Sequence, residues 1–155
     1  MARRPRFALY LDTSALLKLF VEEAESLRVR SLVERPNGAD VLLASRLGRT
    51  EASVSFARMV HLGRIPAGDL PHHLGALDDY WDQSVQEVEL TEEVLEDARQ
   101  LVQRFPLRTY DAIHLASARE ARRMLRGSFD GELRFLAFDA ALLKAAEATG
   151  FTIPG

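Results

Sequence analysis

The stretch Phe7-Ala8-Leu9-Tyr10-Leu11-Asp12-Thr13-Ser14-Ala15-Leu16 decides the fold of this 155-residue chain. Five apolar residues in a row are typical of a strand that is buried on both faces of a sheet. A carboxylate, two hydroxyls and a helical pattern follow directly. We therefore expect Asp12 to lie at the carboxyl end of a central strand, the edge where open α/β sheets bind ligands. There it either caps the next helix or holds a cation.

Strand and helix patterns alternate along the rest of the chain. Such alternation predicts an α/β fold with a mainly parallel sheet flanked by helices on both faces. We expect one domain over residues 1–155, since this length suits one full core and is too short for two. The sequence predicts strands at 7–11, 41–44, 84–90 and 133–138, an edge strand at 151–153, and helices at 14–20, 23–34, 45–62, 67–81, 91–105, 109–126 and 140–149.

Composition narrows the function classes. The chain has no cysteine, which excludes disulfides and thiolate metal sites and fits a cytoplasmic protein. No apolar run approaches the roughly 20 residues of a membrane span, and Asp12 and Lys18 interrupt the apolar stretch that a signal peptide would need. The formal net charge is −3, so binding to a polyanion must rely on local positive charge.

Four acidic residues stand where solvated surface acids are uncommon. Asp12 and Asp139 each follow an apolar strand, Glu51 borders the apolar side of a helix, and Asp111 lies in the first turn of another. Helix capping and the helix dipole explain single cases. If all four reach one sheet edge, their like charges raise one another's pKa and favour a bound cation. No lysine or arginine is placed by the sequence to neutralise all four.

The ligand types indicate which cation would bind. Oxygen ligands without cysteine or histidine favour Mg²⁺, with Mn²⁺ as the second choice. One or two such ions can activate water and stabilise the leaving oxygen when a phosphodiester is hydrolysed. His114 follows Asp111 by three residues, which places both on one helix face. We interpret His114 as a packing residue or a support for the acids and not as a metal ligand.

Four segments, in this order and spacing, resemble the PIN-domain ribonucleases, and most closely the VapC toxins of bacterial toxin–antitoxin pairs. The segments are Tyr10–Lys18 (YLDTSALLK), Ala44–Leu47 with Glu51-Ala52, Leu107–Ala118 (LRTYDAIHLASA) and Phe135–Leu142 (FLAFDAAL). Each segment alone is a weak motif, whereas the four together are fairly specific. The resemblance extends from about residue 7 to the end of the chain.

The resemblance implies a PIN-like three-layer sandwich with an acidic pocket for Mg²⁺ or Mn²⁺. It also implies a toxin that cleaves RNA, forms a homodimer and is inhibited by a cognate antitoxin. By motif position, the catalytic and metal-binding acids fall on Asp12, Glu51, Asp111 and Asp139. The hydroxyl that accompanies the first acid falls on Thr13 or Ser14.

RNA binding by an acidic chain needs cations near the acids. Arg46, Arg49 and Arg108 lie closest to them in sequence and are candidates for contacts with RNA. A salt bridge or a solvated side chain is the alternative for each arginine.

Two further functions compete with the nuclease. One is a PIN-like domain that binds RNA or protein with little or no catalysis. It is favoured by Ala137, where many members carry threonine or serine two residues before the last acid. The other, a phosphatase of the haloacid dehalogenase type, is set aside, because it needs a second acid two residues after the first and this chain has Ser14 there. A phosphorylated receiver domain is disfavoured because 7–11 offers no paired acids.

Overall fold

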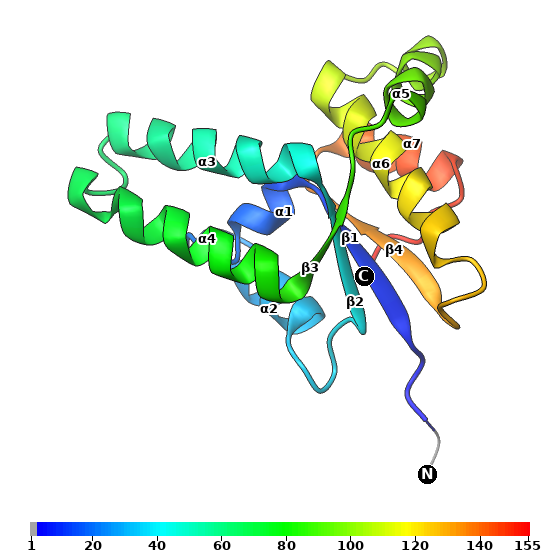
Figure 1. Cartoon of the computed structure of the whole chain (residues 1–155), viewed down its shortest axis with the longest axis horizontal. Coiled ribbons are helices and arrows are strands. Elements are labelled where there is room, and N and C mark those ends of the chain that lie inside the picture. The colour runs from blue at the N-terminus through cyan, green and yellow to red at the C-terminus, as the bar shows by residue number, and fades with distance from the viewer. Residues whose placement is uncertain (1–2) are drawn as a thin grey trace.

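The computed structural model describes residues 3–155 and contains one parallel four-stranded sheet (Figure 1). The strand order is β3-β2-β1-β4, and every neighbouring pair is parallel. The strands are β1 (Phe7–Leu11), β2 (Val41–Ser45), β3 (Val85–Val88) and β4 (Glu132–Leu136). The predicted central position of β1 is confirmed, with Tyr10 paired to Leu43 on one side and to Phe135 on the other.

Helices cover both faces of the sheet, which confirms the predicted three-layer α/β fold. One face packs against α1 (Thr13–Leu17), α2 (Ser26–Val33), α3 (Arg46–His61) and α4 (Leu70–Ser84), the last preceded by the short 3₁₀ helix η1 (Ala67–Asp69). The other face packs against α5 (Glu92–Arg104), α6 (Thr109–Leu125) and α7 (Ala140–Ala148). In Figure 1, α3 and α4 lie side by side and extend away from the sheet.

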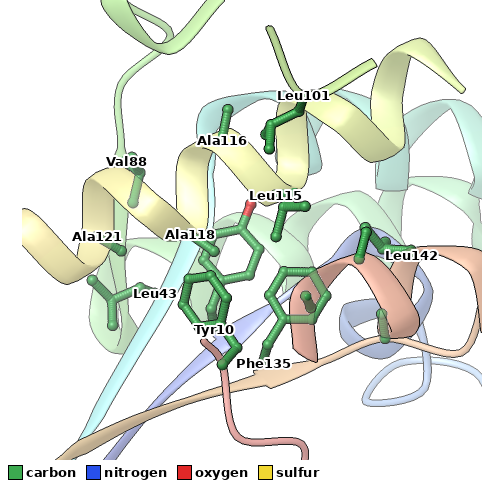
Figure 2. Close-up of a cluster of buried hydrophobic side chains, with 14 of the residues drawn as sticks. Tyr10, Leu43, Val88, Leu101, Leu115, Ala116, Ala118, Ala121, Phe135 and Leu142 are labelled. Carbon is green, nitrogen blue, oxygen red and sulfur yellow. The ribbon is translucent and has the colours of Figure 1, made fainter. Parts of the chain in front are cut away.

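The alternation of side chains along β1 explains its unbroken apolar sequence. Leu9 and Leu11 face the core beneath α1–α4, whereas Ala8 and Tyr10 face the core beneath α5–α7. Figure 2 shows the Tyr10 ring beside Phe135, and the two rings are stacked with centroids 5.4 Å apart. Because both faces are buried, a charged side chain is accommodated only after Leu11, where the strand ends.

Several predicted boundaries differ from the structure. The helix expected at 14–20 ends at Leu17, and the helix expected at 23–34 begins at Ser26, because Glu25 adopts a left-handed conformation (φ 71°) before it. The edge strand expected at 151–153 is wrong: Thr152 makes only an isolated bridge to Arg134. Pro154 has no N–H group and cannot extend that pairing.

No helix within residues 3–155 is long and apolar enough to cross a membrane. The single-domain organisation over residues 1–155 stays a prediction.

Candidate active site

The two strand-end aspartates cap helices at the same edge of the sheet. Asp12 follows β1, and its Oδ1 accepts hydrogen bonds from the backbone N–H of Ala15 (2.9 Å) and the hydroxyl of Ser14 (2.7 Å). Asp139 follows β4, and its Oδ1 accepts from the N–H of Leu142 (2.9 Å). In residues 3–155, Asp12 Oδ2 has no hydrogen-bond partner, so capping leaves that oxygen for another ligand.

Glu51 is held by a buried network of side chains. The Thr13 hydroxyl donates to Glu51 Oε1 over 2.7 Å, and His114 Nε2 lies 2.6 Å from the same oxygen. On its other side, His114 Nδ1 lies 2.9 Å from the Tyr10 hydroxyl. His114 is only 2% exposed, so these contacts exchange little with solvent. They connect a residue in the middle of β1 to a carboxylate on α3.

Arg108 joins the other two acids. It precedes α6, and its side chain is 82% exposed. Its Nε lies 3.4 Å from Asp111 Oδ2, and a terminal nitrogen lies 3.3 Å from Asp139 Oδ2. One guanidinium therefore neutralises part of the charge of two carboxylates. The sequence leaves a salt bridge open for Arg108 but does not predict that Asp111 and Asp139 are its partners.

Burial raises the pKa of two of the four acids at this edge, and neighbouring charges modify the shift. Burial raises the pKa of Asp12, and the charge of Asp111 raises it further, against the opposing effects of His114 and Ser14. Burial also raises the pKa of Asp111, where Arg108 opposes the shift and Asp139 adds to it. For Glu51, burial favours the neutral form, but contacts with His114 and Thr13 outweigh it and lower the pKa.

The four acids share one edge but do not form the single cluster that we expected. In the part of the chain that the structure describes, no group of three or more histidine, aspartate or glutamate side chains is arranged to hold a metal ion. Glu51 is tied to Thr13 and His114, whereas Asp111 and Asp139 share Arg108.

The other two arginines considered as contacts for RNA are, like Arg108, engaged in ion pairs. Arg49 lies 2.8 Å from Asp78 and 3.3 Å from Asp82, and these pairs join α3 to α4. Arg46 lies 2.9 Å from Glu87 at the end of the sheet. Their contact with RNA stays a prediction.

Tyr10 was also missed, because its apolar neighbours marked it only as a core residue. The signal that could have found it is period-two alternation, which places Tyr10 on the same face of β1 as the helix that carries His114.

Fold and site define an α/β protein with capped, strand-end aspartates at the carboxyl edge of a parallel sheet. The family model described as "PIN domain" matches residues 9–139, and the chain belongs to the PIN-domain family.

Two relatives from Mycobacterium tuberculosis are similar over most of the chain. The chain is 33% identical to Ribonuclease VapC45 over 70% of its own length and 73% of the relative's. It is 31% identical to Ribonuclease VapC47 over 92% and 93% of the two chains.

Two solved structures share the fold. The crystal structure of VapC20 from M. tuberculosis, described as a sarcin–ricin loop cleaving toxin, has a TM-score of 0.63 at 17% identity over 93% of this chain and 96% of that one. A toxin–antitoxin complex from Klebsiella pneumoniae has a TM-score of 0.52 at 20% identity over 81% and 82%.

Proposed function

We propose that the protein is a metal-dependent endoribonuclease and the toxin of a toxin–antitoxin pair. The observation that carries the proposal is the gathering of Asp12, Asp111 and Asp139 at one sheet edge, where their charges act on one another. The kinship with ribonucleases named VapC supports the reaction class. The sarcin–ricin loop cleaving toxin and the toxin–antitoxin complex support RNA and a cognate antitoxin as partners.

The residues present fit a divalent cation. The donors are carboxylate oxygens, the set that suits Mg²⁺ and Mn²⁺. Asp12 Oδ2 lacks a partner within residues 3–155, and the exposed Arg108 side chain lies where a cation would neutralise Asp111 and Asp139. Asp12, Asp111 and Asp139, with Glu51, would hold the ion, which when bound activates water and stabilises negative charge on the leaving oxygen.

The chain's own side chains prepare this edge for hydrolysis. Thr13 and His114 occupy Oε1 of Glu51, and Oε2 has no hydrogen-bond partner in residues 3–155, so it is free to accept a hydrogen bond from a water molecule. The lowered pKa keeps Glu51 ionised at neutral pH. Attack of water forms a bond to phosphorus and breaks the bond to the 3′ oxygen, so the products carry 5′-phosphate and 3′-hydroxyl ends.

RNA digestion with Mg²⁺ and with EDTA tests the proposal, and sequencing of the product ends tests the nucleophile. Asp12→Asn and Asp111→Asn should abolish cleavage and keep the circular dichroism of the wild type. Asp130→Asn, in an exposed loop before β4, is the matched control and should cut normally. Products with 2′,3′-cyclic phosphate ends, or full cleavage by either site variant, would contradict the mechanism.

The second candidate function is a PIN-like module that binds without cutting. Ala137 favours it, because this residue is buried and offers no hydroxyl near Asp139. Calorimetry with Mn²⁺ separates the two functions. Binding to the wild type that is lost in Asp12→Asn supports the nuclease, whereas no binding to either protein supports the module.

Three further properties belong to the same proposal. A homodimer and a cytoplasmic location stay predictions, as does the direct contact of Arg46, Arg49 and Arg108 with RNA. Analytical ultracentrifugation of the purified protein tests the dimer.

A further inference from the structure

A cleft begins at Glu51 of the candidate active site and extends away from the three aspartates. It has a volume of about 290 Å³ and runs along α3 from Thr13 and Glu51. Beyond these two residues it is lined by Leu47, Thr50, Val54, Ser55, Arg58 and Tyr110. Thr13 and Glu51 belong both to the cleft and to the candidate active site, so the two are continuous.

Two side chains in this cleft are unusually open to solvent for their type. Tyr110 is 58% exposed although it directly precedes Asp111, and Val54 on α3 is 55% exposed. An exposed aromatic ring beside a catalytic edge is a stacking platform for a nucleic-acid base, because every base has a π face.

Arg58 supplies positive charge at the far end of the cleft. It lies seven residues after Glu51 on the same helix, which is about 10 Å along the axis and two turns further on. Arg58 has no ion-pair partner within residues 3–155, unlike Arg49 on the same helix. An arginine without a counter-ion is suited to a phosphate.

We propose that this cleft holds the single-stranded RNA segment that leads into the active site, with a base stacked on Tyr110 and a phosphate held by Arg58. The proposal rests on the proposed function for its ligand. A single strand fits better than a peptide, because the cleft offers one ring, one cation and the hydroxyls of Thr50 and Ser55, and because Glu51 of the candidate active site is part of its lining. A segment of a protein inhibitor in the same cleft is the competing outcome.

The test measures binding and not cleavage, so that it does not depend on a metal. Fluorescein-labelled single-stranded oligouridylate and oligoadenylate are titrated with protein in EDTA at low salt, and the anisotropy gives Kd. Tyr110→Ala should weaken binding about 5- to 150-fold, the loss of one stacked base, whereas Tyr110→Phe should bind like the wild type.

Arg58→Ala should reduce the magnitude of the slope of log K against log salt by about 0.7, the contribution of one phosphate on a single strand. The matched controls are Arg126→Ala, after α6 and outside the cleft, and Leu62→Ala, 62% exposed beyond the end of α3. Both should leave Kd and slope unchanged. Circular dichroism checks that each variant is folded.

Three results would overturn the proposal. These are wild-type affinity in both Tyr110→Ala and Arg58→Ala, equal losses in Tyr110→Phe and Tyr110→Ala, or no binding of either oligonucleotide by the wild type. A protein that binds RNA through Tyr110 but never cuts it would refute the nuclease and leave this inference standing. A protein that cuts RNA, but whose RNA affinity is unchanged in Tyr110→Ala and Arg58→Ala, would support the nuclease and refute this inference. A segment of a protein inhibitor would then be the occupant of the cleft.

Discussion

Tyr10→Phe tests whether the buried network supports the fold as well as Glu51. The change keeps the ring that stacks on Phe135 and removes only the hydroxyl that lies 2.9 Å from His114 Nδ1. Tyr10 is fully buried and His114 is 2% exposed, so solvent has little access to replace the lost partner. A buried group left without its partner costs about 1–3 kcal/mol. In a domain of this size, each kcal/mol lowers Tm by about 2–4 °C.

Urea denaturation followed by circular dichroism measures the loss, with Tyr80→Phe as the matched control. The Tyr80 hydroxyl has no hydrogen-bond partner in residues 3–155, so its removal should change the free energy of unfolding by less than about 0.5 kcal/mol. A Tyr10→Phe protein as stable as Tyr80→Phe would refute the reasoning, because the contact to His114 would then contribute nothing.

A double-mutant cycle extends the same prediction to the site. No hydrogen bond joins Tyr10 to Glu51 within residues 3–155, but each contacts His114. If the network acts as a unit, Tyr10→Phe and Glu51→Gln should show a coupling energy above about 0.5 kcal/mol. Strictly additive effects would mean that His114 holds Glu51 without help from β1.

Three other substitutions have outcomes that the structure fixes. Asp12→Asn should unfold at a higher temperature than the wild type at pH 7 in EDTA. The pKa of Asp12 is raised in the folded protein, so its carboxyl group stabilises the fold below the unfolded pKa of about 4, and this contribution is lost as pH rises through the folded pKa. Thermal melts at pH values decreasing from 7 should show the difference in Tm between variant and wild type shrinking. Gly48→Ala should stabilise by about 0.5–1 kcal/mol in urea titrations, since the added Cβ would lie 3.6 Å from Thr13 Oγ1, an ordinary contact, and alanine favours the helix. Gly131→Ala should destabilise by about 1–3 kcal/mol in the same assay, because its Cβ would lie 2.7 Å from the backbone oxygen of Arg6.

The sequence was most informative where one physical constraint acted alone. The apolar run of β1 predicted a strand buried on both faces, and the alternation of elements predicted a parallel sheet, because a parallel strand pair needs a helical crossover. Helix boundaries were harder to predict. Glutamate rarely adopts the left-handed conformation that Glu25 has, so the sequence did not predict that α2 begins only at Ser26.

Charge partners were the part that could not be predicted. Arg49 pairs with Asp78 and Asp82, which lie about thirty residues further along the chain, only because α3 and α4 pack together. Arg108 contacts Asp139 because β4 lies next to β1 in the sheet, and Asp139, which follows β4, lies close to Arg108 at the start of α6. Such pairs depend on tertiary distances of a few ångströms, and sequence spacing contains no information of that kind.

Capping and ion binding at the strand ends are compatible, although the sequence presents them as alternatives. Oδ1 of Asp12 accepts from the N–H of Ala15, and Oδ1 of Asp139 accepts from the N–H of Leu142. These hydrogen bonds fix the orientation of each carboxylate and therefore also the position of its second oxygen, Oδ2. Glu51 has no backbone N–H to fix it and depends on Thr13 and His114 instead. The position of Glu51 is therefore the one most sensitive to changes in the core. The Tyr10 hydroxyl on β1 contributes to it through its contact with His114.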